Sequence, residues 1–163
     1  MAELTGRTIT LREMKLKEMR AFWRKYVSPS GETPFVYDEE RVDLLFEKLA
    51  QQTATKMVGV FTKTDEIIGI VSFGRIVLSE SRCELTLYLA NESFRGKGIE
   101  ADALILAKQY AKRELSVSRI YADVSTKNTV LQTAMKESGF LHTKTFKGGM
   151  SDGGDRMSYF AHC

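Results

Sequence analysis

The feature that most constrains this sequence is a strand, a glycine-containing basic loop and a helix that follow one another between residues 85 and 110. Residues 85–89 form a short run typical of a strand, and the loop at residues 95–100 comes shortly after it. The helix is predicted by apolar residues that recur on one face at helical spacing: Ile99, Ala103, Leu106, Ala107 and Tyr110. A basic loop that leads into a helix N-terminus is therefore expected near the middle of the fold.

The loop has chemistry that suits an anion. Its residues are Arg95, Gly96, Lys97, Gly98, Ile99 and Glu100. The first turn of a helix leaves backbone N–H groups without partners, and the helix dipole favours negative charge there. One interpretation is a phosphate or pyrophosphate cradle; the other is a plain loop with two solvated cations. The order Gly-Lys-Gly does not fit a P-loop, and two glycines are too few for a dinucleotide fingerprint.

The loop resembles the Arg-x-x-Gly-x-Gly/Ala acetyl-CoA loop of the GNAT N-acetyltransferases, except that Glu100 stands where Gly or Ala is usual. A downstream stretch is similar to the family's Asn-x-x-Ala-x-x-Leu-Tyr-x-x-x-Gly-Phe helix and turn. Its matching positions are Asn128, Leu131, Ala134, Gly139 and Phe140. Ile9–Arg12 looks like the family's first strand, so the resemblance covers nearly the whole chain. It includes a weaker similarity to the branch that acetylates the N-termini of ribosomal proteins.

Periodicity along the rest of the chain predicts a mixed α/β fold with the order β-α-α-β-β-β-α-β-α-β-β. We expect strands at residues 7–13, 57–62, 67–76, 82–89, 120–124, 140–146 and 157–162, and helices at 19–26, from Asp38 onward, at 99–110 and at 129–137. The resemblance implies a strongly twisted mixed sheet, flanked by about four helices and splayed where the cofactor enters. Residues 1–163 are expected to form a single domain.

Composition limits the possible partners. Hydrophobic content of 43% and charged content of 28% are ordinary for a globular domain. A net charge of +3 without a dense Lys/Arg tract suits an anionic cofactor but predicts no nucleic-acid partner. Two cysteines and two histidines offer little material for a metal site, and no long apolar run predicts a membrane span. We expect a cytoplasmic protein, and the resemblance implies a monomer or a homodimer.

The resemblance also implies how the site works. An acetyl group passes directly from acetyl-CoA to a primary amine, with the pyrophosphate on the backbone N–H groups of residues 95–100. The pantetheine arm lies along Leu87, Tyr88 and Leu89 and contacts Asn128. The early helices of this fold often line the acceptor cleft, which could bring one of Phe22, Trp23 and Tyr26 to the substrate. The turn-rich stretch at residues 148–155 either borders that cleft or is a plain hairpin connection.

Acetyl transfer needs a base, because an amine with a pKa of about 10.4 attacks only in its neutral form. Glu84, on the strand before the loop, is our candidate base, unless it is a surface or salt-bridged glutamate; Asp123 is a weaker candidate. The family often places a tyrosine acid where this chain has Met135, which cannot donate a proton. Tyr88, Tyr121 or a water could protonate the CoA sulfur instead, or the thiolate could leave unaided.

The prediction is an acetyl-CoA-dependent N-acetyltransferase acting on a peptide or small-molecule amine. Protein N-termini, lysines, polyamines, amino sugars and antibiotics all remain open as acceptors. Because Met135 removes the usual acid, the alternative is a non-catalytic acyl-CoA-binding domain of the same fold.

Overall fold

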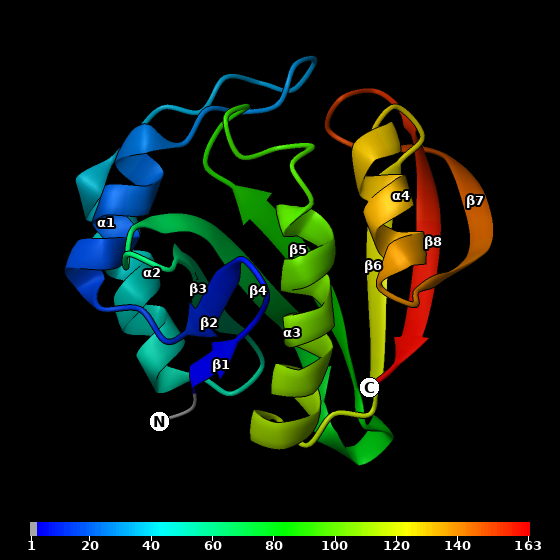
Figure 1. Ribbon diagram of the computed structural model, residues 1–163, viewed down its shortest axis with the longest axis horizontal. Helices are drawn as coiled ribbons and strands as arrows, with labels where there is room; N and C mark the ends of the chain where they lie inside the picture. The colour runs from blue at the N-terminus through cyan, green and yellow to red at the C-terminus, as the bar shows by residue number, and fades with distance from the viewer. Residues whose placement is uncertain (1–2) are drawn as a thin grey trace.

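The computed structural model describes residues 3–163 and contains eight strands and four α-helices in that range (Figure 1). The elements are β1 (Glu3–Thr5), β2 (Ile9–Arg12), α1 (Leu16–Lys25), α2 (Glu39–Gln51), β3 (Lys56–Thr62), β4 (Ile67–Val77), a 3₁₀ turn (Leu78–Glu80), β5 (Arg82–Leu89), α3 (Ile99–Glu114), β6 (Arg119–Ser125), α4 (Thr129–Glu137), β7 (Leu141–Gly149) and β8 (Asp155–His162).

The strands form one mixed sheet in the order β1-β2-β3-β4-β5-β6-β8-β7. Strands β1 to β5 are antiparallel neighbours, whereas β5 and β6 are parallel and are joined by the crossover helix α3. The mixed α/β fold and its element order are confirmed. Two features went unpredicted: the short strand β1, and the insertion of β8 between β6 and β7.

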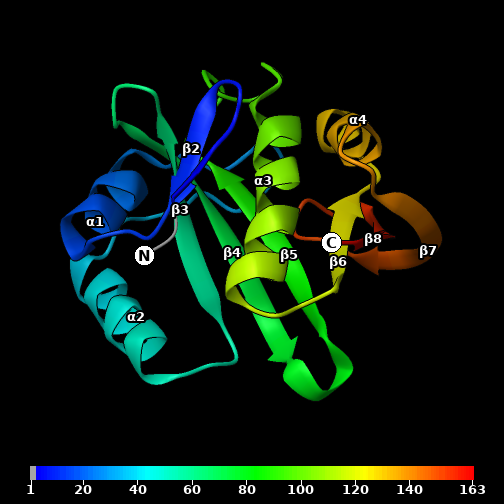
Figure 2. The same ribbon diagram turned by 60° about the horizontal axis from the view of Figure 1, so that its bottom comes forward.

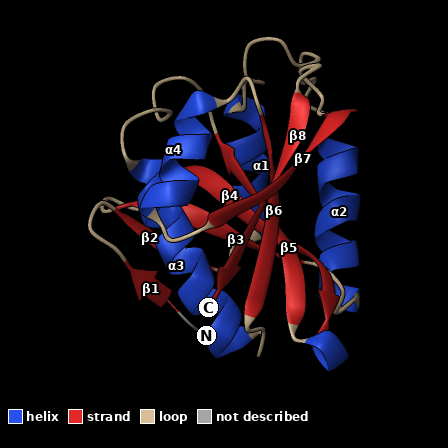
Figure 3. Cartoon of the chain, turned by 90° about the vertical axis from the view of Figure 1, so that its right-hand side faces the viewer, coloured by secondary structure: helices blue, strands red, loops and turns tan. Residues whose placement is uncertain are grey.

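Helices cover both faces of the sheet (Figure 3). One hydrophobic cluster lies between the sheet and α3 and α4, and contains Cys83, Leu85 and Tyr110. The other lies under α1 and α2, and contains Phe22, Trp23 and, at its edge, Tyr88. The alternation of β5 therefore sends its leucines toward α3 and Tyr88 toward α1, as the side-chain period of a strand requires.

The two halves of the sheet part at its centre (Figure 2). Strands β5 and β6 pair only between Arg82–Glu84 and Arg119–Tyr121, near the start of each strand. Beyond Glu84, β5 continues to pair with β4 as far as Leu89. Among the described strands, none pairs with the edge of β5 that faces β6 beyond Glu84, where the cavity opens.

Two general properties of the described chain bear on its function. Within residues 3–163, no helix is long and apolar enough to cross a bilayer. The same residues contain no group of three or more His, Cys, Asp or Glu side chains that could hold a metal ion.

Candidate active site

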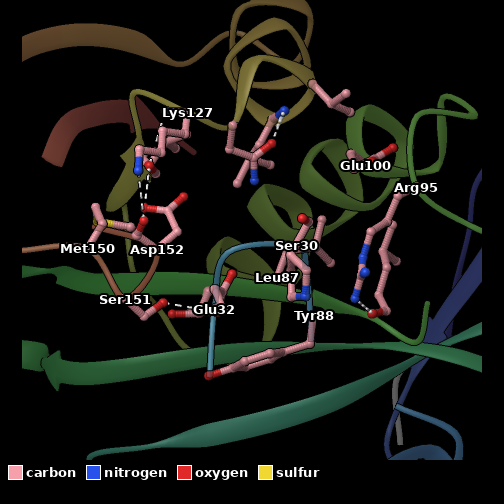
Figure 4. A pocket seen from close by; sticks show the side chains of 18 of the residues that line it. Ser30, Glu32, Leu87, Tyr88, Arg95, Glu100, Lys127, Met150, Ser151 and Asp152 are labelled. Atoms are coloured by element: carbon pink, nitrogen blue, oxygen red, sulfur yellow. Dashed lines mark hydrogen bonds between the residues drawn. The ribbon is translucent and has the colours of Figure 1, made fainter. Parts of the chain in front are cut away.

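A cavity of about 450 Å³ lies between the diverging ends of β5 and β6, within the range typical of small-molecule sites. Its wall combines the end of β5, the loop before α3, the end of β6 and the start of α4. Two loops complete it, the α1–α2 loop (26–38) and the β7–β8 loop (150–154). Figure 4 shows side chains from these segments pointing toward one space.

The edge of β5 offers backbone N–H groups to this cavity. Ala90 N donates to Ile68 O of β4 at 2.9 Å, and in an antiparallel ladder every second residue bonds to the same neighbour. Leu87 and Leu89 therefore direct their backbone groups away from β4. Arg95 Nη2 reaches Leu89 O at 2.9 Å from that open side, in agreement with this direction. The N–H groups of Leu87 and Leu89 are available to a ligand that lies along the strand.

The glycine loop has the backbone of an anion cradle. Gly96 and Gly98 have φ angles of 73° and 84°, the left-handed region that glycine adopts without strain. Gly98 is the N-cap of α3 and has no side chain to satisfy the N–H groups of the first turn. A Cβ placed on Gly98 would meet no atom within 4 Å. Among the described residues, the first turn of α3 therefore has no side-chain cap, and the space beside Gly98 is open.

Arg95 has a structural task in this loop. Its guanidinium donates to Val27 O at 2.6 Å and Leu89 O at 2.9 Å, and pairs with Glu92 at 2.7 Å. These contacts tie the end of β5 to the chain that follows α1. Lys97, by contrast, is exposed. Although Arg95 lines the cavity, the positive charge expected from it is already compensated by Glu92.

Glu100 is directed at the glycine loop that precedes α3. Its side chain turns back into the loop, where Oε2 accepts a hydrogen bond from Gly96 N at 2.9 Å. The residue is only 6% exposed and lines the cavity. In the described chain no ion pair joins Lys97 to Glu100. The carboxylate is therefore bonded to the backbone of the loop and not to the Lys97 side chain.

Asn128 lies at the cavity and caps α4. Its Oδ1 accepts from Leu131 N at 3.0 Å, which satisfies one N–H of the first turn. The carboxamide NH₂ group is not needed for this cap. Asn128 can therefore hold α4 in place and still donate to a ligand, as a contact with a pantetheine arm would require.

The two carboxylates considered as bases lie in different places. Glu84 is not among the cavity-lining residues, and its Oε2 pairs with Arg75 Nε at 3.0 Å on the surface. Asp123 does line the cavity and accepts from Ser158 Oγ at 3.1 Å. Strand alternation places Glu84 on the same face as Tyr88. Glu84 lies four residues before Tyr88, however, where β5 and β6 are still paired.

The candidate acids are also separated. Tyr88 lines the cavity, and burial, followed by the negative charge of Glu32, raises the pKa of its phenol. Tyr121 is not a lining residue; its ring packs on Phe160 with the centroids 5.1 Å apart. Met135 is buried in the core between the sheet and the helices. Of these residues, only Tyr88 brings a hydroxyl group to the cavity.

Two loops contribute residues that the sequence did not single out. Glu32 and Ser151 both line the cavity and are joined by a hydrogen bond of 3.0 Å from Ser151 Oγ to Glu32 Oε1. Asp152 accepts from Ser125 Oγ and Gly154 N, both at 2.8 Å. Burial alone would raise the pKa of Asp152, but these hydrogen bonds and the nearby Lys127 outweigh it and lower that pKa. The only sequence signals that pointed to these loops were the glycine-rich composition of residues 148–155 and the aromatic helix face that includes Tyr26. Tyr26 also lines the cavity.

The cavity has more negative than positive side chains. Its carboxylates come from five residues and its cations from two: Glu32, Glu92, Glu100, Asp123 and Asp152, against Arg95 and Lys127. Arg95 is paired with Glu92, and Lys127 Nζ donates to the backbone O of Asp152 at 3.0 Å. In Figure 4, Arg95 and Glu100 lie on one side and Lys127, Ser151 and Asp152 on the other. Cations are the ligands that this lining favours.

Comparison with known proteins identifies the family. Residues 8–141 match the acetyltransferase (GNAT) domain. The chain belongs to the GNAT acetyltransferase family. Its relatives include the Bacillus subtilis protein named "Probable N-acetyltransferase YjcK", with 24% identity over 84% of this chain and 82% of that protein. A Bacillus licheniformis protein named "Uncharacterized N-acetyltransferase p20" is 25% identical over 79% of this chain and 76% of that protein.

Solved structures with the same fold include spermidine N-acetyltransferases. The Vibrio cholerae enzyme in complex with CoA and spermine superposes with a TM-score of 0.81 at 18% identity, covering 94% of this chain and 95% of that one. A chimera of the Vibrio cholerae enzyme with hSSAT gives a TM-score of 0.82 at 19% identity, with the same coverage. These likenesses establish the GNAT fold for residues on both sides of the cavity.

The described residues fit the thioester cofactor of a GNAT protein in most respects. The free edge of β5 suits an extended pantetheine arm, and the open first turn of α3 suits phosphate oxygens. The NH₂ group of Asn128 is a further donor. Glu100 is the exception, because its own carboxylate already accepts a hydrogen bond from the N–H of Gly96 in the glycine loop.

Proposed function

We propose that this GNAT acetyltransferase transfers an acetyl group from acetyl-CoA directly to a small cationic amine. The observation that carries the proposal is the cavity between β5 and β6. It joins the free edge of β5 to an opening lined by Glu32, Asp123 and Asp152, which we call the acidic mouth. A linear polyamine is the acceptor that fits best, since its several ammonium groups can contact several carboxylates. The complex of a relative with CoA and spermine supports this choice.

The acidic mouth distinguishes a small cationic acceptor from a neutral one. Glu32, Asp123 and Asp152 come from three segments that meet around the opening. Asp152 carries a lowered pKa and stays ionised at neutral pH. The electrostatic potential at the opening therefore attracts cations and raises their local concentration. A protein N-terminus brings one charge and a peptide backbone, for which this lining is a poorer match.

The chemical step is a direct acyl transfer. The neutral amine nitrogen attacks the thioester carbon, the C–S bond breaks, and the acetyl group becomes an amide. The amine loses one proton to a base, and the sulfur leaves as a thiolate that accepts one proton. The carbonyl oxygen carries negative charge in the transition state, and the N–H groups of Leu87 and Leu89 are positioned to donate to it.

Glu32 and Tyr88 are the residues we assign to the proton transfers. Glu32 is held by Ser151 and lies close enough to raise the pKa of Tyr88, after burial. It can accept the amine proton directly or through a water. Tyrosine is protonated at neutral pH even at its ordinary pKa of about 10, and burial raises the pKa of Tyr88 further, so its hydroxyl has a proton to donate to the departing sulfur. Glu32 thus replaces Glu84 as our candidate base. Tyr88 is our candidate acid, the role that Met135 cannot fill.

The test is an acetyl-transfer assay with acetyl-CoA and a panel of spermidine, a monoamine and an N-terminal peptide, with products identified by mass. We expect spermidine to have the highest kcat/KM. Glu32→Gln should lower that value by about 100-fold, the scale of a general base.

Glu47→Gln is the matched control, because Glu47 is an exposed glutamate of α2 away from the cavity. It should retain wild-type transfer. A peptide that is acetylated better than spermidine would contradict the small-amine assignment. Tight binding of acetyl-CoA without transfer to any amine would instead favour the non-catalytic acyl-CoA-binding alternative.

A further inference from the structure

Glu100 places a negative charge where the family's cofactor loop normally has only glycine or alanine. Its carboxylate lies against the loop, with Oε2 2.9 Å from Gly96 N, and the residue is 6% exposed. A buried carboxylate is retained only where donors compensate it. Here the donor is a backbone N–H of the loop that would otherwise serve an external anion.

The surrounding charges do not cancel this effect. Arg95, the cation at the start of the loop, is held by Glu92 and by two backbone carbonyls. Lys97 is exposed and makes no ion pair with Glu100 within residues 3–163. The loop thus combines the shape of an anion cradle with an anion of its own.

We propose that Glu100 is a built-in anion that competes with the pyrophosphate of the donor for the glycine loop, and thereby sets donor affinity and donor choice. This inference rests on the proposed acetyl-CoA-dependent function. A donor pyrophosphate can occupy the loop only after the carboxylate leaves Gly96 N, and the two negative groups then remain close neighbours in a partly buried site. A thioester donor without phosphates meets no such competition.

The geometry supports competition over simple helix capping. A glutamate in the first turn of a helix is stabilised by the dipole even when its side chain points to solvent. Glu100 instead lies at the cavity and accepts a hydrogen bond from the N–H of Gly96, a loop residue outside α3. The space before Gly98 remains open, so the cradle is only partly filled and a ligand can still enter it.

The experiment compares two donors in wild type, Glu100→Ala and Glu100→Gln. Binding of acetyl-CoA is measured by calorimetry, and transfer from acetyl-CoA and from S-acetyl-pantetheine to spermidine is measured as kcat/KM. We expect Glu100→Ala to bind acetyl-CoA at least tenfold more tightly, about 1.4 kcal/mol. Glu100→Gln should gain less, because its amide oxygen can still accept from Gly96 N. Transfer from S-acetyl-pantetheine should be the same in all three proteins.

Glu114→Gln controls for net charge, since Glu114 is an exposed residue at the far end of α3. It should bind acetyl-CoA as wild type does. Thermal denaturation checks folding, and if Glu100→Ala is unstable the isosteric Glu100→Gln carries the test.

Unchanged or weaker binding of acetyl-CoA in the Glu100 variants would overturn the inference, as would an equal gain for both donors. The two proposals fail in different ways. Tighter binding of acetyl-CoA with no acetylation of any amine would contradict the proposed function alone. Normal acetylation with no gain in affinity would contradict only the role of Glu100.

Discussion

Arg95 and Lys97 are two cations of one loop with different roles. Arg95 makes three hydrogen bonds through its guanidinium, two of them to backbone carbonyls of Val27 and Leu89. Lys97 is exposed beside the open first turn of α3. A sequence motif cannot separate these roles, because both residues are simply positive.

We therefore predict that removing the Arg95 charge affects stability, whereas removing the Lys97 charge affects cofactor binding. Arg95→Ala should lower the free energy of unfolding by about 2 kcal/mol, since hydrogen bonds from a charged group contribute about 1.5–3 kcal/mol. Lys97→Ala should leave that free energy within about 0.5 kcal/mol, as for most surface changes, and should weaken acetyl-CoA binding several-fold. Urea denaturation and calorimetry of each variant measure the two quantities. A loss of stability in Lys97→Ala, with none in Arg95→Ala, would reverse the assignment.

Glu84 shows what residue patterns can and cannot locate. Alternation along β5 correctly placed its side chain on the face shared by Thr86 and Tyr88. It could not reveal that β5 and β6 stay paired as far as Glu84 and part only beyond it. Because the cavity begins where the strands part, Thr86 and Tyr88 line it and Glu84 does not.

At the scale of elements, α4 is positioned by a residue that also faces the ligand. Asn128 caps the helix through Oδ1 and leaves its NH₂ group for the cavity. The two roles can be separated by substitution, because aspartate is as good an N-cap as asparagine but has no NH₂ donor.

Asn128→Asp should keep the stability of wild type, whereas Asn128→Ala should lose about 1 kcal/mol. Both variants should weaken acetyl-CoA binding, and Asn128→Asp more strongly, because it adds negative charge beside a negative cofactor. Thermal unfolding and calorimetry on the same samples test this pattern. Equal affinity in Asn128→Asp and wild type would mean that Asn128 serves only as the cap.

Element positions followed well from local patterns. The expected strand at residues 82–89 and the expected helix at 129–137 coincide with β5 and α4, since alternation and capping are local properties of the chain. Asp38, from which the second helix was expected to run, is the N-cap of α2 and accepts from Arg41 N at 3.3 Å. The place of β8 between β6 and β7 depends on pairing between distant segments, which no local pattern encodes.

At the scale of the whole molecule, the site depends on segments that the sequence keeps far apart. Glu32 and Ser151 are separated by 119 residues and meet over the cavity through one hydrogen bond. Each stands in a loop whose residue pattern predicts only a turn. The acidic mouth became visible only once the fold had brought these loops together, whereas the glycine loop and Asn128 carry their signal in consecutive residues.

The core between the sheet and α3 should make the whole fold sensitive to alkali. Burial raises the pKa of the Cys83 thiol to about 12, with smaller contributions from Cys163 and Glu84. An unfolded cysteine has a pKa of about 8.5, so the unfolded chain releases this proton first as the pH rises. The stabilising contribution is complete below about pH 8.5 and is lost between that pH and about 12, at up to about 1.4 kcal/mol per pH unit.

Cys83→Ala tests this origin. Its unfolding free energy should be lower at neutral pH because of the small cavity, so the informative quantity is the slope against pH. The unfolding free energy is measured by urea denaturation under reducing conditions between about pH 8.5 and pH 10. Its slope against pH should be shallower in Cys83→Ala than in wild type, by an amount that corresponds to up to about one proton released on unfolding. The same substitution at Cys163, which is only partly buried, should change the slope less. Equal slopes in Cys83→Ala and wild type would mean that the thiol of Cys83 is not what ties the stability of this core to pH.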